Sequence, residues 1–220
     1  MKYIYSWCSF NATRLPDQNY TAMAECTVSS LKSFAESADK LVFYTDEQGK
    51  AAFNDILTYF DEVVVIDKFG ENFSNKFYYY EKYYVASLQN EPFIHLDFEM
   101  LFIEKPEFDD AHDIIAYDAF GSSFENSDTF MFFDDKENTE TINIAIEILG
   151  TYSNFDIFKT MIEFVDNNCT KDKIEEFDCY KQDAVSMYMK RVCRENDYSI
   201  YYMRYFTKID NLKNIQQLLN

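Results

Sequence analysis

Residues 92–102 of the chain have the sequence PFIHLDFEMLF, in which two carboxylates, Asp97 and Glu99, interrupt an apolar run. The residues before Asp97 favour β-structure, so the stretch predicts a buried strand leading into the first acid. A buried carboxylate is costly unless a partner offsets its desolvation, and a bound cation is one such partner. Side chains alternate along a strand, which predicts both acids on one face and Phe98 on the other.

Asp97 and Glu99 are therefore candidate ligands of a divalent metal ion. Mg²⁺ and Mn²⁺ favour oxygen ligands, and one or two carboxylates leave positions for the phosphates of a substrate. An ion placed here would offset the charge of a diphosphate leaving group. The alternative is a strand that runs into a loop, with both acids in solvent.

The composition indicates a folded, acidic protein. The 220 residues are long enough for one α/β domain with a sizeable core, and 47% of them are hydrophobic. The formal net charge is −19, and this excess of acids disfavours nucleic acid and anionic membranes as partners. An anionic sugar nucleotide stays possible as a ligand if a metal and a few local cations supply positive charge.

The five cysteines are scattered, without a CxxC pair or the spacing of a zinc site. An odd number of cysteines without a signal peptide predicts reduced thiols and a cytoplasmic protein. No apolar run approaches the length of a membrane span.

Strand-like and helix-like segments alternate over the first hundred residues, which predicts a mainly parallel central sheet flanked by helices. We expect strands at residues 3–7, 40–44, 62–66 and 93–96, helices at 21–35, 51–59 and 76–89, and a turn at 47–49. In such sheets ligands bind beyond the carboxyl ends of the strands, where Asp46, Asp97 and Glu99 fall. No composition break divides the chain, so residues 1–220 are expected to form a single domain.

The second half is less regular. We expect strands at residues 113–117 and 141–149, a loop at 120–130, and helices at 155–165 and 180–192.

Several segments share a pattern with a known group of enzymes. They are residues 44–46 (YTD), Lys82, residues 89–99 (QNEPFIHLDFE), residues 143–146 (NIAI), residues 164–168 (FVDNN) and Gln182. Together they resemble the GT-A glycosyltransferases, specifically a bacterial group distantly similar to the glycogenin-type (family 8) enzymes. The similarity spans residues 1–190. Three departures are Glu99 in place of an aspartate, Ala145 in place of a glycine, and the lack of a His-x-Gly-x-x-Lys segment.

The resemblance implies a GT-A-like, nucleotide-sugar-binding α/β domain. It implies transfer of a sugar from a nucleotide-sugar donor, with UDP as the expected nucleotide, to an unknown glycan, lipid-linked or protein acceptor. It further implies Mn²⁺ or Mg²⁺ held by Asp97 and Glu99, and donor contacts from Asp46, Lys82, Asp97, Asn143 and Gln182. It names no catalytic nucleophile or base.

Each of these residues also has a structural alternative. Asp46 is suited to cap a helix, and the stem of Lys82 to cover aromatic surface with its ammonium in water. Asn143 and Gln182 are equally suited to satisfy buried backbone groups. His95 is expected to be a hydrogen-bonded core residue and His112 a loop residue.

Two other functional classes stay open. One is a GT-A-like sugar- or nucleotide-binding protein that has lost catalysis, which the three departures favour. The other is a metal-dependent phosphoryl enzyme, although the chain has no P-loop and no further acid cluster.

Overall fold

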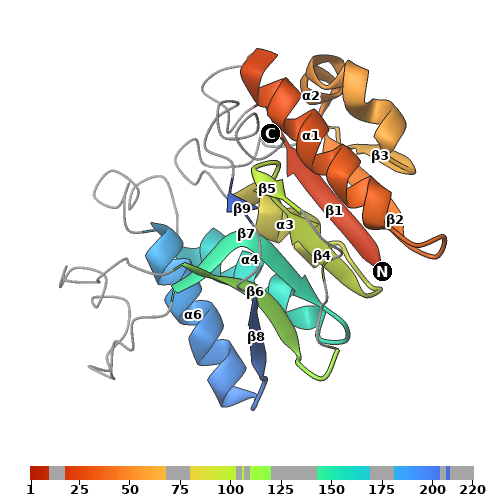
Figure 1. Cartoon of the computed structure of the whole chain (residues 1–220). Helices are drawn as coiled ribbons and strands as arrows, with labels where there is room; N and C mark the ends of the chain where they lie inside the picture. Colours follow the sequence, from red (N-terminus) through yellow and green to blue (C-terminus); the bar gives the residue numbers. More distant parts are fainter. Residues whose placement is uncertain are drawn as a thin grey trace.

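The structure, a computed structural model, describes residues 1–9, 18–67, 80–102, 106, 110–119, 143–168, 181–203 and 207–208. Its centre is a sheet of seven strands in the order β3-β2-β1-β4-β7-β6-β8 (Figure 1). These strands are β1 (Lys2–Trp7), β2 (Lys40–Thr45), β3 (Glu62–Val65), β4 (Phe93–Leu96), β6 (Ile114–Ala119), β7 (Asn143–Thr151) and β8 (Ile200–Met203). A small antiparallel pair, β5 (Met100–Leu101) and β9 (Thr207–Lys208), forms a second sheet.

The central sheet is mainly parallel, as the sequence predicts. Strand β1 pairs in parallel with β2 and β4, β2 with β3, and β6 with β8. Only β7 runs against its described neighbours, β4 and β6. The carboxyl ends of β1, β2 and β4 therefore meet at one edge of the sheet, which we call the carboxyl edge.

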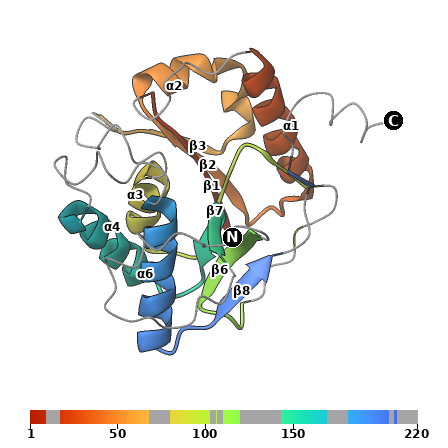
Figure 2. The same ribbon diagram turned by 90° about the vertical axis from the view of Figure 1, so that its left-hand side faces the viewer.

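Helices cover both faces of the sheet (Figure 2). The described helices are α1 (Gln18–Phe34), α2 (Glu47–Ala52), the 3₁₀ helix η1 (Asn54–Tyr59), α3 (Tyr80–Ser87), α4 (Asp156–Asn168) and α6 (Lys181–Glu195). Residues of α3, α4 and α6 share one hydrophobic cluster, and residues of α1 and η1 share the other. Strand β1 separates the two clusters by alternation, because Ile4 belongs to the first and Tyr3 and Tyr5 to the second.

Two local expectations are wrong. Residues 47–49, expected as a turn, form the first turn of α2, because the Asp46 side chain caps this helix by accepting from the Gly49 N–H. The helix expected at residues 51–59 is instead the end of α2 followed by η1. The loop expected at residues 120–130 lies outside the described residues.

No helix in the described ranges is long and apolar enough to cross a bilayer.

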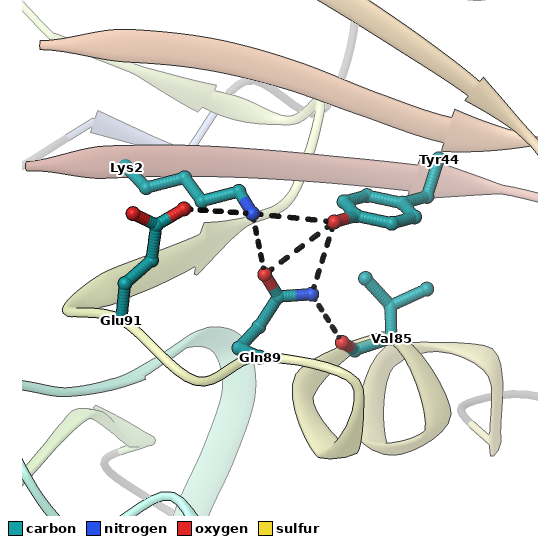
Figure 3. A network of polar contacts seen from close by, with 5 residues as sticks. All are labelled: Lys2, Tyr44, Val85, Gln89 and Glu91. Carbon is teal, nitrogen blue, oxygen red and sulfur yellow. Dashed lines mark hydrogen bonds and ion pairs between the residues drawn. The ribbon is translucent and has the colours of Figure 1, made fainter.

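A polar network fixes the end of α3 against the sheet (Figure 3). The Gln89 side chain accepts from Lys2 Nζ at 2.8 Å and donates to the Val85 carbonyl at 2.7 Å. Lys2 also pairs with Glu91 at 3.3 Å, and its ammonium donates to the Tyr44 hydroxyl at 3.3 Å. Since Gln89 is buried, its bonds satisfy polar atoms of its side chain that water does not reach, and they hold the end of α3 in place relative to β1 and β2.

Candidate functional site

The two acids that interrupt the apolar run lie in a tight turn at the carboxyl edge. Strand β4 ends at Leu96, and the Met100 N–H donates to the Asp97 carbonyl at 3.1 Å, which closes a turn with Phe98 and Glu99 at its centre. The expectation that alternation along a strand places Asp97 and Glu99 on one face is wrong, because the extended conformation ends before Asp97. Both acids are partly exposed.

Phe98 anchors this turn in the aromatic core. Its ring stacks on Tyr5 with centroids 4.9 Å apart and on Phe53 with centroids 5.1 Å apart. Each such pair contributes about 0.5–1.5 kcal/mol beyond its buried area. The turn that carries the two carboxylates is thus held by a buried side chain between them.

Lys82 and Asp97 form an ion pair on the α3 side of the sheet. Lys82 Nζ lies 2.7 Å from Asp97 Oδ2, and the two side chains are 5% and 19% exposed. Burial opposes ionisation of Asp97, but the charge and hydrogen bond of Lys82 hold its pKa below the usual value, and the Phe98 N–H assists. Asp97 is therefore an ionised carboxylate whose charge a neighbouring ammonium already balances.

His95 is a core residue, as the sequence analysis expected. It is fully buried, and its Nε2 lies 2.8 Å from Ser6 Oγ. Burial and the charge of Lys82 lower its pKa to about 3, so the ring is neutral at pH 7. Its Nδ1 has no hydrogen-bond partner among the described residues. His112 lies in the bend before β6, with its ring 5.4 Å from that of Tyr201.

Asp46 connects two loops at the carboxyl edge. One carboxylate oxygen accepts from the Ser9 N–H at 2.8 Å and from Ser9 Oγ at 2.5 Å, and the other accepts from the Gly49 N–H at 2.7 Å. The capping role proposed as an alternative for Asp46 is therefore present, and a donor-binding role stays a prediction.

The contact between Ser9 and Asp46 was not predicted from the sequence, although the expected parallel strands could have indicated it. Parallel pairing places Trp7 opposite Thr45, so the residues that follow these strands emerge side by side. The residues after β1 were therefore candidates for contact with Asp46.

Asn143 and Gln182 can be placed only by their backbones. Asn143 begins β7, and Ile148 of the same strand pairs with Leu96, so the start of β7 extends past the end of β4 at the carboxyl edge. Gln182 lies in the first turn of α6. Their side chains lie outside what the structure describes, and their contacts stay predictions.

Asp97 and Glu99 are the residues of the turn that could hold a divalent cation together with a ligand phosphate. Within the described residues, no group of three His, Cys, Asp or Glu side chains gathers closely enough to hold a metal ion. Asp97 and Glu99 nevertheless supply carboxylate oxygens from one turn, and Mg²⁺ in phosphate-binding sites needs only one or two carboxylates from the protein. The remaining ligands would be phosphate oxygens and water.

Comparison with protein families gives one match. Residues 7–118, just over half of the chain, match the model described as "Family of unknown function (DUF6734)". The chain belongs to this family. The match begins at the last residue of β1 and includes β2 to β4, Asp46, Lys82 and the turn with Asp97 and Glu99, so the candidate site lies mostly inside the matched segment. Comparison with curated protein sequences finds no significant match.

Three solved structures that are similar to this DUF6734 protein come from two enzyme classes. Mouse xyloside xylosyltransferase 1 aligns with a TM-score of 0.52 and 13% identity, over 92% of this chain and 85% of the other. The galactosyltransferase LgtC, in complex with donor and acceptor sugar analogues, aligns with a TM-score of 0.53 and 10% identity, over 93% and 73%. The CTP:phosphocholine cytidylyltransferase of Streptococcus pneumoniae aligns with a TM-score of 0.54 and 14% identity, over 99% and 96%.

These alignments show a fold shared with GT-A glycosyltransferases and with nucleotidyltransferases. At such low sequence identity these alignments show a shared fold and do not show a shared function. The expected α/β class and GT-A-like architecture are thus confirmed, whereas the likeness to family 8 stays a proposal.

Proposed function

We propose that this DUF6734 protein is a metal-dependent glycosyltransferase that uses a nucleotide-sugar donor, with UDP as the nucleotide. The observation that carries the proposal is the turn at the carboxyl edge, where Asp97 and Glu99 follow β4 and Lys82 faces Asp97. Ligands of open α/β sheets bind at this edge, and the same fold occurs in enzymes that transfer sugars. The similarity to family 8 enzymes in the sequence supports the choice of donor.

In this proposal the protein holds the diphosphate while the sugar leaves. The bond between the anomeric carbon and the phosphate oxygen breaks, and its electron pair stays on the nucleoside diphosphate. A hydroxyl oxygen of the acceptor forms the new bond to the anomeric carbon, and its proton passes to the departing diphosphate or to water. Asp97 and Glu99 would hold Mg²⁺ or Mn²⁺, which would supply positive charge where this negative charge develops. Asp46 organises the loops after β1 and β2, and Lys82 provides a second cation near the diphosphate. The acceptor is a glycan, a lipid-linked sugar or a protein.

Calorimetry with UDP in the presence and absence of Mn²⁺ tests the proposal. We expect Mn²⁺-dependent UDP binding, which Asp97→Asn abolishes and Glu99→Gln weakens less because the longer side chain is more easily replaced by water. Loss of Asp97 also leaves Lys82 buried without its counter-charge, which typically costs about 3–5 kcal/mol of stability, so circular dichroism must confirm folding. Glu99→Gln leaves that ion pair in place and serves as the milder variant.

Asp61→Asn is the matched control. Asp61 lies just before β3, at the opposite edge of the sheet, and pairs with Lys32 at 2.6 Å. Its removal tests the loss of an ion pair away from the site, and UDP binding should persist. Unchanged Mn²⁺ dependence in Asp97→Asn would mean that the acids of the turn do not hold the metal.

Two further readouts separate the alternatives. Slow Mn²⁺-dependent hydrolysis of a UDP-sugar supports the transferase, whereas binding without hydrolysis supports a binding protein that has lost catalysis. CTP belongs in the same panel, because the cytidylyltransferase aligns as well as the glycosyltransferases do. Preference for CTP over every UDP-sugar would contradict the proposal.

A further inference from the structure

The ion pair between Lys82 and Asp97 is unlike the exposed pairs of this protein. Its two side chains are 5% and 19% exposed, whereas the equally short pair of Lys32 and Asp61 has side chains that are 38% and 41% exposed. Solvent therefore screens the charges of the Lys82 pair weakly. A change in the charge near Asp97 should therefore strongly alter the electrostatic energy of the Lys82 ammonium.

The carboxylate that Lys82 contacts is also the proposed ligand of the divalent cation. A metal ion bound to Asp97 would lie within a few ångströms of an ammonium that is itself 2.7 Å from Asp97 Oδ2. Two cations so close together in a weakly screened site repel each other. Binding of the metal to Asp97 and contact of Lys82 with the same group should therefore compete.

We infer that Lys82 is a displaceable counter-ion, which neutralises Asp97 in the unloaded site and leaves it when a divalent cation binds. The inference rests on the proposed function for the identity of that cation. A diphosphate that arrives with the metal offers the released ammonium a new anionic partner. Lys82 thereby makes the site bind the metal weakly alone and more tightly together with a diphosphate, which is a coupling between two ligands.

Affinity for Mn²⁺ alone tests the competition. Free Mn²⁺ is measured by electron paramagnetic resonance in titrations of the wild type, Lys82→Met and the control Lys32→Met. Removal of the competing ammonium should tighten Mn²⁺ binding about tenfold in Lys82→Met, within the usual range of coupling between sites. Lys32→Met should match the wild type. Unchanged or weaker binding in Lys82→Met would overturn the inference, because Lys82 would then act only as a structural partner of Asp97.

Two further measurements cover the case in which Lys82→Met fails to fold. Lys82→Gln keeps a hydrogen-bond donor near Asp97 while it removes the charge, and it should also bind Mn²⁺ more tightly. In the wild type with ¹³C-labelled lysine, the Lys82 εCH₂ resonance should shift when diamagnetic Mg²⁺ saturates the site. An unchanged resonance at saturating Mg²⁺ would overturn the inference without any substitution.

Repeating the Mn²⁺ titrations with UDP separates the two proposals. UDP should tighten Mn²⁺ binding about tenfold in the wild type and less than about threefold in Lys82→Met, because the ammonium transmits part of the coupling. Tighter Mn²⁺ binding by Lys82→Met without a UDP effect in any variant would support the counter-ion and reject the nucleotide. A UDP effect of equal size in the wild type and in Lys82→Met would support nucleotide binding and reject the role of Lys82 in the coupling.

Discussion

At the scale of single residues, the carboxyl edge is packed closely where α2 meets the sheet. A Cβ atom added to Gly49 would overlap Thr45 Oγ1 and lie 2.5 Å from Cε3 of the Trp7 ring. Gly49 is also the residue whose N–H is capped by Asp46. The lack of a side chain at this position therefore lets α2 approach β1 and β2 closely enough for the cap to form.

Gly49→Ala should destabilise the protein even though alanine is the better helix former. Alanine in place of glycine favours a helix by about 1 kcal/mol, whereas overpacking against the Thr45 and Trp7 side chains costs about 1–3 kcal/mol. We expect a net loss in the free energy of unfolding, measured by urea denaturation. Lys50→Ala, on the exposed side of the same helix, should stay within about 0.5 kcal/mol of the wild type. A more stable Gly49→Ala would show that the space beside Trp7 is larger than described.

The positions of the candidate-site residues were predictable from the sequence to different extents. The place of Asp97 at the end of β4 was predictable, because an apolar run leads into it. Its partner Lys82 was predictable only as a nearby helix residue, since the contact depends on how α3 packs on the sheet. The geometry of Asp97 relative to Glu99 was not predictable, because a single backbone hydrogen bond from Met100 turns the chain where alternation would continue.

At the scale of elements, periodicity in the sequence predicts the strands and helices of the first half and also β6, β7, α4 and α6 of the second half, but not the direction of β7 or the presence of β8. Strands β1 to β4 are short apolar runs between polar turns, and each was placed within a residue or two of its observed bounds. The reversal of β7 is not encoded in its own residues, since an apolar strand with two buried faces looks the same in either direction. Strand β8 was missed, because its pairing partner β6 lies over eighty residues earlier.

The start of β6 is joined to two distant segments by one carboxylate. Asp113 accepts from the Ser199 N–H at 2.8 Å and from Ser199 Oγ at 2.9 Å, just before β8, and from the Asn154 amide at 2.6 Å, just before α4. The Ser199 N–H is the main cause that holds the pKa of Asp113 below its ordinary value, against the opposing effect of burial. Asp113 therefore favours the folded state in its ionised form.

This linkage predicts how stability changes with pH. A carboxyl group whose pKa is lowered by folding contributes fully above its unfolded pKa, here 3.8, and loses the contribution as the pH falls through the lower folded value. Because Asp113 is partly exposed and solvent screens its charge, Asp113→Asn should reduce the free energy of unfolding by at most about 1 kcal/mol at pH 7 and by less at pH 2.5. Denaturation at both pH values measures the difference. The exposed Asp55→Asn is the control, and an equal loss at both pH values would mean that the charge of Asp113 is irrelevant.

At the scale of the whole molecule, the site depends on both faces of the sheet. Lys82 lies on α3, whose apolar residues pack in one cluster with α4 and α6, whereas Phe98, which anchors the turn, belongs to the cluster with α1 and η1. A disturbance of either cluster should therefore change the geometry at Asp97. The stacking of Phe98 on Tyr5 and Phe53 shows that aromatic side chains support the site as well as the core.

The rate at which the cysteines react with an alkylating reagent measures how well these clusters exclude solvent. Cys8 and Cys193 are each 2% exposed within the cluster under α3, α4 and α6, whereas Cys26 on α1 is partly exposed. Burial, aided by the charge of Asp113, raises the pKa of the Cys193 thiol to about 12. Because the thiolate is the reactive form, Cys193 should react only when the structure opens.

Alkylation followed by peptide mass spectrometry tests this order. In native protein at pH 8, iodoacetamide should modify Cys26 first, and modification of Cys8 and Cys193 should wait for global unfolding, because both lie deep in the core. Denaturant below the unfolding transition should leave these two rates low, and denaturant above it should make all three rates similar. Rapid native labelling of Cys8 with slow labelling of Cys193 would show that the strands at the carboxyl edge open separately from α6.

In fully denatured, unreduced protein every cysteine should be alkylated, including Cys169 and Cys179, which lie outside the described residues. Two blocked positions would instead indicate a disulfide and an oxidising compartment.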